Sequence, residues 1–227
     1  MNGLSGVRYF LGFFAAPDGA RFFDRVRLSP AGEAWTGEGL RLISGRSEPE
    51  RYSITGVSRD GGFVLDLAHD GCHERLTLSA ETPDVEACFL GSLVRTGDDT
   101  ALAYVLEEAP AVRLDPSPTH GWGTVAVATV AKGSEMLVIR GPIGDTQTPY
   151  SFRTADDRHV EPTGYGHFVN HACEPSCEIV YRPDGRPALR ARRALEPGEE
   201  ITFDYTATEG ELAGSFACLC PAERHKV

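Results

Sequence analysis

Residues 168–177 read FVNHACEPSC and residues 198–205 read GEEITFDY. Two shorter segments flank them, HGWG at residues 120–123 and FACLC at residues 216–220. Each segment has an ordinary explanation when taken alone, because a Gly-x-Gly is usually a turn and a Pro-Gly-Glu-Glu run commonly precedes a strand. The four together, in this order, decide the prediction for the second half of the chain.

In their order and content, the four segments resemble the SET domain of protein lysine methyltransferases. That family shows a Gly-x-Gly near its start, an Arg-Phe-x-Asn-His-Ser-Cys-x-Pro-Asn segment, a Gly-Glu-Glu-Leu/Ile-Thr-Phe-Asp-Tyr segment and a Cys-x-Cys-x4-Cys tail. The resemblance covers roughly residues 117–227. It implies a mainly β fold of several small sheets around a threaded, knot-like crossing, which is rare among folds. It also implies an S-adenosylmethionine-dependent enzyme that transfers a methyl group to a lysine amine of a protein or peptide substrate.

The same resemblance implies a cofactor site. Glycines lack a Cβ, so the backbone of the Gly-x-Gly can approach the cofactor closely. Asn170 would bind the methionine end of the cofactor and His171 the adenine end. His167 stands where the family usually has Arg, so its contact with the cofactor carboxylate would be weaker or dependent on pH. The implied cofactor-binding residues are Gly121, Trp122, Gly123, His167, Phe168, Asn170 and His171.

Tyr205 is the predicted catalytic residue. In methyl transfer a neutral lysine amine attacks a methyl group on a sulfonium, so the lysine, whose reference pKa is about 10.4, must first lose its proton. A dry aromatic channel favours that loss, and alignment of the reactants lowers the barrier further. The phenol of Tyr205 would position the reactants without acting as a strong base; the alternative is a buried strand tyrosine. Tyr150 and Tyr165 are further candidates for the channel wall.

Four of the six cysteines fall into two close pairs, which predicts metal binding rather than disulfides in a long chain without a secretion signal. By the resemblance, Cys173, Cys218 and Cys220 would hold zinc beside the cofactor. His225 stands where the family has its last cysteine, and three cysteines with one histidine are an established tetrahedral zinc set. Cys177 is the rival for the fourth place, and a tail of free thiols without metal is the alternative to the whole site.

The first half of the chain shows short apolar runs separated by turn signals. Residues 63–67 and 76–78 alternate between apolar and polar side chains, as strands with one buried face do. We therefore expect residues 1–112 to form an antiparallel β-rich domain of unknown function. Residues 109–120 are rich in proline, as linkers are, so the SET-like catalytic domain with its cysteine-rich tail is expected to span residues 113–227.

The chain has 227 residues and a formal net charge of −11. This charge disfavours direct nucleic-acid binding, which needs a basic face, and it suits a lysine-rich partner. No apolar run has the length that a membrane span needs, and no secretion signal is evident, so a cytoplasmic protein is expected. Two other functions fit the sequence: an enzyme of the same fold that methylates a small-molecule amine, and a non-catalytic module that binds cofactor or zinc.

Overall fold

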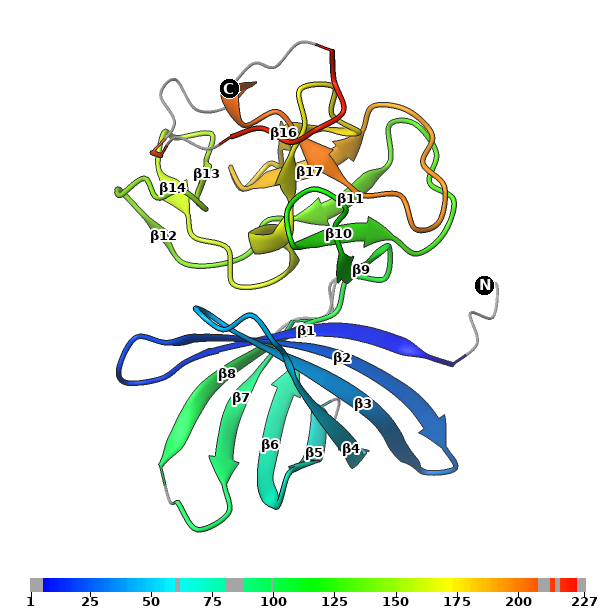
Figure 1. Ribbon diagram of the computed structural model, residues 1–227, viewed down its shortest axis with the longest axis vertical. Helices are drawn as coiled ribbons and strands as arrows, with labels where there is room; N and C mark the ends of the chain where they lie inside the picture. Colours follow the sequence, from blue (N-terminus) through cyan, green and yellow to red (C-terminus); the bar gives the residue numbers. More distant parts are fainter. Residues whose placement is uncertain are drawn as a thin grey trace. The chain divides into compact units, whose positions relative to one another are not determined.

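The computed structural model divides the chain into two compact units, Met1–Pro110 and Ala111–Val227. Regular structure is almost entirely β (Figure 1), so the mainly β fold class expected from the sequence is confirmed. The domain boundary expected between residues 112 and 113 stays a prediction. Within the described part of the chain, no helix has the length and apolar character to cross a membrane. The described residues are 6–59, 62–80, 88–98, 100–207, 213–214 and 217–223.

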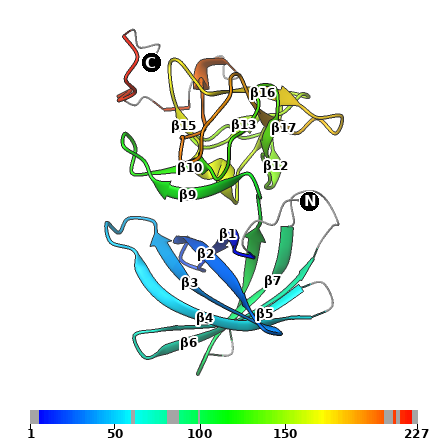
Figure 2. The same cartoon turned by 90° about the vertical axis from the view of Figure 1, so that its right-hand side faces the viewer.

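The first unit is a closed barrel of eight strands (Figure 2). Each strand pairs antiparallel with its neighbours in sequence, and β1 pairs with β8 from Leu11 to Phe13 to close the barrel. The strands are β1 (Arg8–Ala15), β2 (Arg21–Ala31), β3 (Ala34–Ile43), β4 (Glu50–Arg59), β5 (Gly62–His69), β6 (Cys72–Ala80), β7 (Cys88–Arg95) and β8 (Ala101–Glu107).

Alternation along the strands determines which side chains fill the barrel. In β5, Phe63 and Leu67 are buried, whereas the intervening Asp66 is exposed. Strand β6 follows after a turn at Asp70 and Gly71, where both residues have positive φ, as a two-residue hairpin turn of type I′ requires. The strands expected from the alternation at residues 63–67 and 76–78 are confirmed.

A buried ion pair lies inside the barrel. The carboxylate of Asp24 accepts hydrogen bonds from Arg41 Nε at 2.8 Å, Arg41 Nη2 at 3.0 Å and the Tyr104 hydroxyl at 2.8 Å. Arg41 Nη1 lies 2.8 Å from Glu74 Oε2, and its guanidinium lies over the ring of Phe14, 5.0 Å from the centroid. Asp24 is 0% exposed and Arg41 is 2% exposed, so these charges compensate one another out of contact with water.

A second polar cluster lies at the end of the β5–β6 hairpin. His69, Cys72 and Glu74 place potential metal-ligand atoms within 4.8 Å of one another. Both carboxylate oxygens of Glu74 are already bound, since Arg95 Nη2 lies 3.0 Å from Oε1 and Arg41 Nη1 lies 2.8 Å from Oε2. Burial alone would raise the pKa of Glu74, but these two ion pairs lower it. Glu74 therefore belongs to the charge network of the barrel.

The second unit consists of short strands in four small sheets. One sheet pairs β9 (Val112–Pro116) with β10 (Trp122–Ala126), and another has the order β11 (Glu135–Val138), β17 (Pro187–Ala191), β16 (Cys177–Tyr181). A third has the order β12 (Ile143–Gly144), β14 (His159–Val160), β13 (Phe152–Arg153). The fourth pairs β15 (Asn170–His171) with β18 (Thr202–Phe203), and two 3-10 helices complete the unit, η1 (Tyr165–Phe168) and η2 (Tyr205–Ala207).

Strands β15 and β18 are parallel, with Asn170 opposite Thr202 and His171 opposite Phe203. The two longest sequence motifs therefore lie side by side, as the resemblance to the SET fold implies. Ser176 reinforces the pairing, because its hydroxyl accepts a hydrogen bond from Thr202 N at 2.9 Å and its own amide donates to Thr202 Oγ1 at 3.1 Å.

Replacement of Asp24 by alanine is expected to lower the free energy of unfolding by about 3–5 kcal/mol, because Arg41 would keep its buried charge and lose its bidentate partner. Asp66→Ala is the matched control, since it removes an exposed pair with Arg75 and should leave stability almost unchanged. Equilibrium urea unfolding measures both variants. Equal losses of stability in the two variants would show that the buried ion pair contributes no more to the free energy of unfolding than the exposed one.

Candidate active site

The Gly-x-Gly segment leads into β10 after a tight loop. Ser117 N donates to Gly121 O at 2.8 Å, and the Ser117 hydroxyl accepts hydrogen bonds from the amides of Thr119 and His120, both at 3.2 Å. Gly121 has a φ of 72°, in the left-handed region that glycine adopts without strain. Ser117 therefore holds the loop together, and the backbone turn itself requires Gly121.

Asn170 connects this loop to the GEEITFDY segment. Its Nδ2 donates to Trp122 O at 3.0 Å and to Glu200 Oε1 at 2.6 Å. The second carboxylate oxygen of Glu200, Oε2, accepts a hydrogen bond from the Ser117 hydroxyl at 2.9 Å. A Cβ at Gly123 would lie 2.2 Å from Glu200 Oε1. Glycine at this position therefore leaves the room that the carboxylate occupies.

Tyr205 lies in η2, against His171. Its backbone amide donates to His171 Nδ1 at 3.2 Å, and the two ring centroids are 5.2 Å apart in an edge arrangement. Its hydroxyl donates to Val169 O at 2.9 Å. Burial, with a contribution from the Glu200 carboxylate, raises the pKa of the Tyr205 phenol above its ordinary value. The phenol is therefore protonated at neutral pH, which suits positioning by hydrogen bonds and does not suit general-base chemistry.

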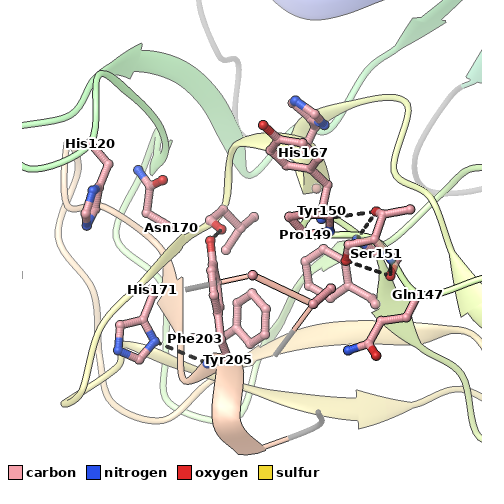
Figure 3. Close-up of a pocket in the computed structure, with 16 residues that line it drawn as sticks. His120, Gln147, Pro149, Tyr150, Ser151, His167, Asn170, His171, Phe203 and Tyr205 are labelled. Carbon is pink, nitrogen blue, oxygen red and sulfur yellow. Dashed lines mark hydrogen bonds between the residues drawn. The ribbon is translucent and has the colours of Figure 1, made fainter. Parts of the chain in front are cut away.

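A pocket of about 370 Å³ opens at these residues (Figure 3). Figure 3 shows Asn170 and His171 on one side, Tyr150 and His167 on the other, and Tyr205 between them. The rings of Tyr150 and His167 stack with their centroids 4.4 Å apart. The volume is in the range of small-molecule and cofactor sites, and the lining combines aromatic surfaces with a few polar groups, as such sites do.

Three cysteine thiols meet beside His171 and are called the cysteine cluster below: Cys173, Cys218 and Cys220. Cys218 Sγ lies 3.8 Å from Cys173 Sγ and 3.3 Å from Cys220 Sγ. Burial raises the pKa of the Cys218 thiol to about 11. Burial alone would also raise the pKa of the Cys220 thiol, but hydrogen bonds from the amides of Cys173 and Ala222 lower it to about 6, so Cys220 is the thiolate of the pair. Thiolates are the form in which cysteines bind metals, so this donor set fits a zinc ion.

His225 and Cys177 are the two predicted candidates for the fourth zinc ligand. His225 lies outside the described residues. Cys177 is fully buried in β16, and burial raises the pKa of its thiol to about 11. Among the described residues, His171 is the side chain grouped with Cys173 and Cys218, with potential ligand atoms within 4.8 Å of one another.

The structure brings several of the predicted site residues to one pocket. The predicted residues that line it are His167, Asn170, His171 and Tyr205. Four predicted cofactor-binding residues, all within the described ranges, are not part of its lining: Gly121, Trp122, Gly123 and Phe168. Tyr150 lines the pocket, whereas Tyr165 is 1% exposed and belongs to the core.

Among the site residues that were not predicted, His120 and Glu200 stand out by their contacts. His120 lines the pocket and Glu200 binds Asn170. Both lie within the segments HGWG and GEEITFDY, so their positions were visible in the sequence. The directions of their side chains follow only from the pairing of distant segments, and no local pattern indicates them.

Comparison with known proteins gives a matching family and several relatives. The sequence model of the SET domain matches residues 72–206, so the match begins within the barrel and ends before Cys218 and Cys220. The histone-lysine N-methyltransferase set1 of Dictyostelium discoideum is 26% identical over 148 residues, 56% of this chain and 10% of that protein. An H3 lysine-4 specific histone-lysine N-methyltransferase of Mycosarcoma maydis is 29% identical over 126 residues, 46% of this chain and 9% of that protein.

The histone-lysine N-methyltransferase TRX1 of Oryza sativa subsp. japonica is 32% identical over 126 residues, which are 46% of this chain and 12% of that protein. The chain thus spans about a tenth of the length of these relatives.

Gly123→Ala is expected to displace the Glu200 carboxylate, because the added Cβ would lie 2.2 Å from Oε1. We expect this overpacking to cost about 1–3 kcal/mol of stability. Gly144→Ala is the control, since nothing lies within 4 Å of a Cβ at that position. Thermal unfolding compares the two variants with the parent. A Gly123→Ala protein as stable as the parent would show that the contact with Glu200 is not as close as the structure has it.

Proposed function

The chain belongs to the SET domain family, whose sequence model matches more than half of its 227 residues, and on this basis we propose that it is an S-adenosylmethionine-dependent protein lysine methyltransferase. One observation carries the proposal. Asn170, His171 and Tyr205 come from two segments far apart in the sequence and meet at one pocket of about 370 Å³. The relatives are named as histone-lysine N-methyltransferases, which supports methyl transfer to a protein lysine as the reaction.

The chemistry of the pocket suits this cofactor. S-adenosylmethionine, when bound, supplies a methyl group activated by a sulfonium. Tyr150 and His167 offer stacked rings on one side of the pocket, and Asn170 and His171 offer polar groups on the other. In the proposal Asn170 binds the amino-acid end of the cofactor and His171 lies at the adenine end, as the resemblance implies. Trp122 contributes indirectly, because its carbonyl oxygen fixes the Asn170 amide.

Tyr205 positions the reacting groups in the proposed reaction. Its phenol stays neutral because its pKa is raised, and its hydroxyl is held by Val169 O at 2.9 Å. The rings of Phe152 and Phe203, which stack at 4.9 Å beside it, make the lining apolar. An apolar lining disfavours a charged lysine ammonium and so favours the neutral amine that attacks the methyl group. The phenol oxygen keeps lone pairs that can orient this amine.

We propose a lysine of a basic protein as the substrate. The formal net charge of −11 would attract a basic peptide by long-range electrostatics and disfavours direct nucleic-acid binding. Histone H3 is the first protein to test, because one relative is named as specific for its lysine 4. The cytoplasmic location expected from the sequence stays a prediction.

The cysteine cluster is the proposed zinc site. Its three thiols lie close together, and zinc in structural sites takes four tetrahedral ligands. The fourth would be His225, by the resemblance. Cys173 follows β15 and the other two cysteines lie in the C-terminal tail, so a bound metal would fix the tail next to the strand that carries Asn170 and His171.

Incubation with methyl-labelled S-adenosylmethionine tests the proposed function. Recombinant histone H3 and a whole-cell extract serve as substrates, and we expect label in protein, located on lysine by mass spectrometry. Label in the small-molecule fraction would instead support an enzyme that methylates a small amine. Tight binding of cofactor without transfer to either fraction would support a non-catalytic module.

Tyr205→Phe removes only the phenol hydroxyl. We expect kcat for methyl transfer to fall by about 100-fold, as for the loss of other preorganised hydrogen-bonding groups, while the Kd for the cofactor stays near that of the parent. Tyr181→Phe, at an exposed tyrosine, is the matched control. Full activity in Tyr205→Phe would show that the hydroxyl does not position the reacting groups.

Elemental analysis of the purified protein tests the zinc site, and we expect about one zinc per chain. Cys218→Ser should lower the zinc content strongly because it removes a central thiol of the cluster. Cys177→Ser should leave the zinc content unchanged, and a loss of zinc in His225→Ala would identify the fourth ligand. A parent protein without zinc, purified in the absence of chelators, would refute the assignment.

A further inference from the structure

Glu200 lies behind the pocket and joins three parts of the site. Its Oε1 accepts from Asn170 Nδ2 at 2.6 Å, and its Oε2 accepts from the Ser117 hydroxyl at 2.9 Å. Its backbone forms an isolated β-bridge with Val125 in β10. The pocket is lined by Asn170 but not by Glu200, although the structure describes both residues. The side chain of Glu200 is therefore joined to the pocket by its hydrogen bond with Asn170.

The hydrogen bonds of Asn170 define which end of its amide meets a ligand. Its nitrogen has two hydrogens, and they are directed to Trp122 O at 3.0 Å and to Glu200 Oε1 at 2.6 Å. A flipped amide would place its oxygen against a carbonyl and a carboxylate, both of which only accept hydrogen bonds. The nitrogen is thus committed to the protein, and Oδ1 is the atom left for the pocket. In Figure 3 the oxygen lies on the side nearer Tyr205 and the nitrogen on the far side.

We propose that Glu200 is a positioning residue that makes Asn170 present a hydrogen-bond acceptor to the cofactor. A carbonyl oxygen held in this way binds a cationic N–H donor, and the α-ammonium at the amino-acid end of S-adenosylmethionine is such a group. The negative charge of Glu200 behind the amide favours the same ligand charge. This inference rests on the proposed function, because it names the ligand group that Asn170 meets at the same site.

Two other residues fix the position of the Glu200 carboxylate. Gly123 leaves the space for it, since a Cβ there would lie 2.2 Å from Oε1 and 3.2 Å from Asn170 Nδ2. Ser117 holds its second oxygen and also binds the amides of Thr119 and His120 in the loop before Gly-x-Gly. The orientation of the Asn170 amide is therefore fixed by the loop and by the GEEITFDY segment together.

Two ligands that differ only in the amino-acid end test the proposal. S-adenosylhomocysteine carries the α-ammonium, whereas 5′-methylthioadenosine has the same adenosine and a thioether but no amino-acid end. In Glu200→Gln we expect the affinity for S-adenosylhomocysteine to fall roughly tenfold, because an oriented hydrogen bond to a charged group is weakened. The affinity for 5′-methylthioadenosine should stay within about twofold of the parent, since that ligand lacks the ammonium. Isothermal titration calorimetry measures both.

Three further variants complete the test. Glu199→Gln is the matched control, because the Glu199 carboxylate pairs with Arg193 and, in the described part of the chain, Glu199 is not among the residues that line the pocket. Ser117→Ala removes the donor to Glu200 Oε2 together with the acceptor for the amides of Thr119 and His120. It should give the same ligand selectivity at roughly threefold, which keeps the test open if Glu200→Gln folds poorly. In an Asn170→Ala background, Glu200→Gln should have no further effect on S-adenosylhomocysteine.

Equal losses for both ligands, or no loss for either, would overturn the role of Glu200 and leave the proposed function standing, provided that the parent binds S-adenosylhomocysteine and transfers methyl groups. An additional loss in the Asn170→Ala background would overturn the route through Asn170. A parent protein that does not bind S-adenosylhomocysteine would overturn the proposed function and this inference with it.

Discussion

The parallel pairing of β15 with β18 is the constraint on which the candidate site depends. Only two residue pairs form it, Asn170 with Thr202 and His171 with Phe203. Parallel neighbours need a long crossover connection, and here that connection contains β16 and β17. A pairing of this length is weak by itself, so the side-chain hydrogen bonds of Ser176 with Thr202 supply a further part of its stability. The pairing brings the amide of Asn170 and the phenol of Tyr205 to one pocket.

The buried polar groups of the two units find their partners in different ways. In the barrel, the backbone groups are paired by regular antiparallel neighbours, and the buried charges of Asp24 and Arg41 compensate one another. In the second unit the strands are short, so side chains such as Ser117 and Thr124 bind backbone groups directly. Polar side chains in such irregular segments can also be directed toward a ligand. The second unit is therefore better suited than the barrel to form a binding site.

The sequence predicted what depends on local pattern or on recognisable motifs. The alternation around Phe63 and Leu67 predicted strands, and the motifs predicted that Asn170, His171 and Tyr205 lie together. Closure of the barrel could not be predicted, because the pairing of β1 with β8 joins strands at opposite ends of the unit. The buried ion pair of Asp24 and Arg41 could not be predicted either, because a charged residue in an alternating strand is expected to face water.

Within the site, the glycines show the limit of motif reasoning most clearly. The Gly-x-Gly was interpreted as room for the backbone to approach a cofactor. In the structure Gly121 is required by a turn with positive φ, and Gly123 leaves space for the Glu200 carboxylate. The protein's own conformation therefore requires Gly121, and the Glu200 carboxylate occupies the space beside Gly123. The approach of this backbone to a cofactor stays a prediction.

His171 lies between two parts of the second unit. Its Nδ1 accepts the amide hydrogen of Tyr205, so in the neutral ring the proton is on Nε2, 3.3 Å from Cys173 Sγ. With the proton on Nε2, His171 would donate to Cys173 Sγ and would not itself be a ligand of a metal bound at the cysteine cluster. One ring therefore contacts both Cys173 of the cysteine cluster and the backbone of Tyr205.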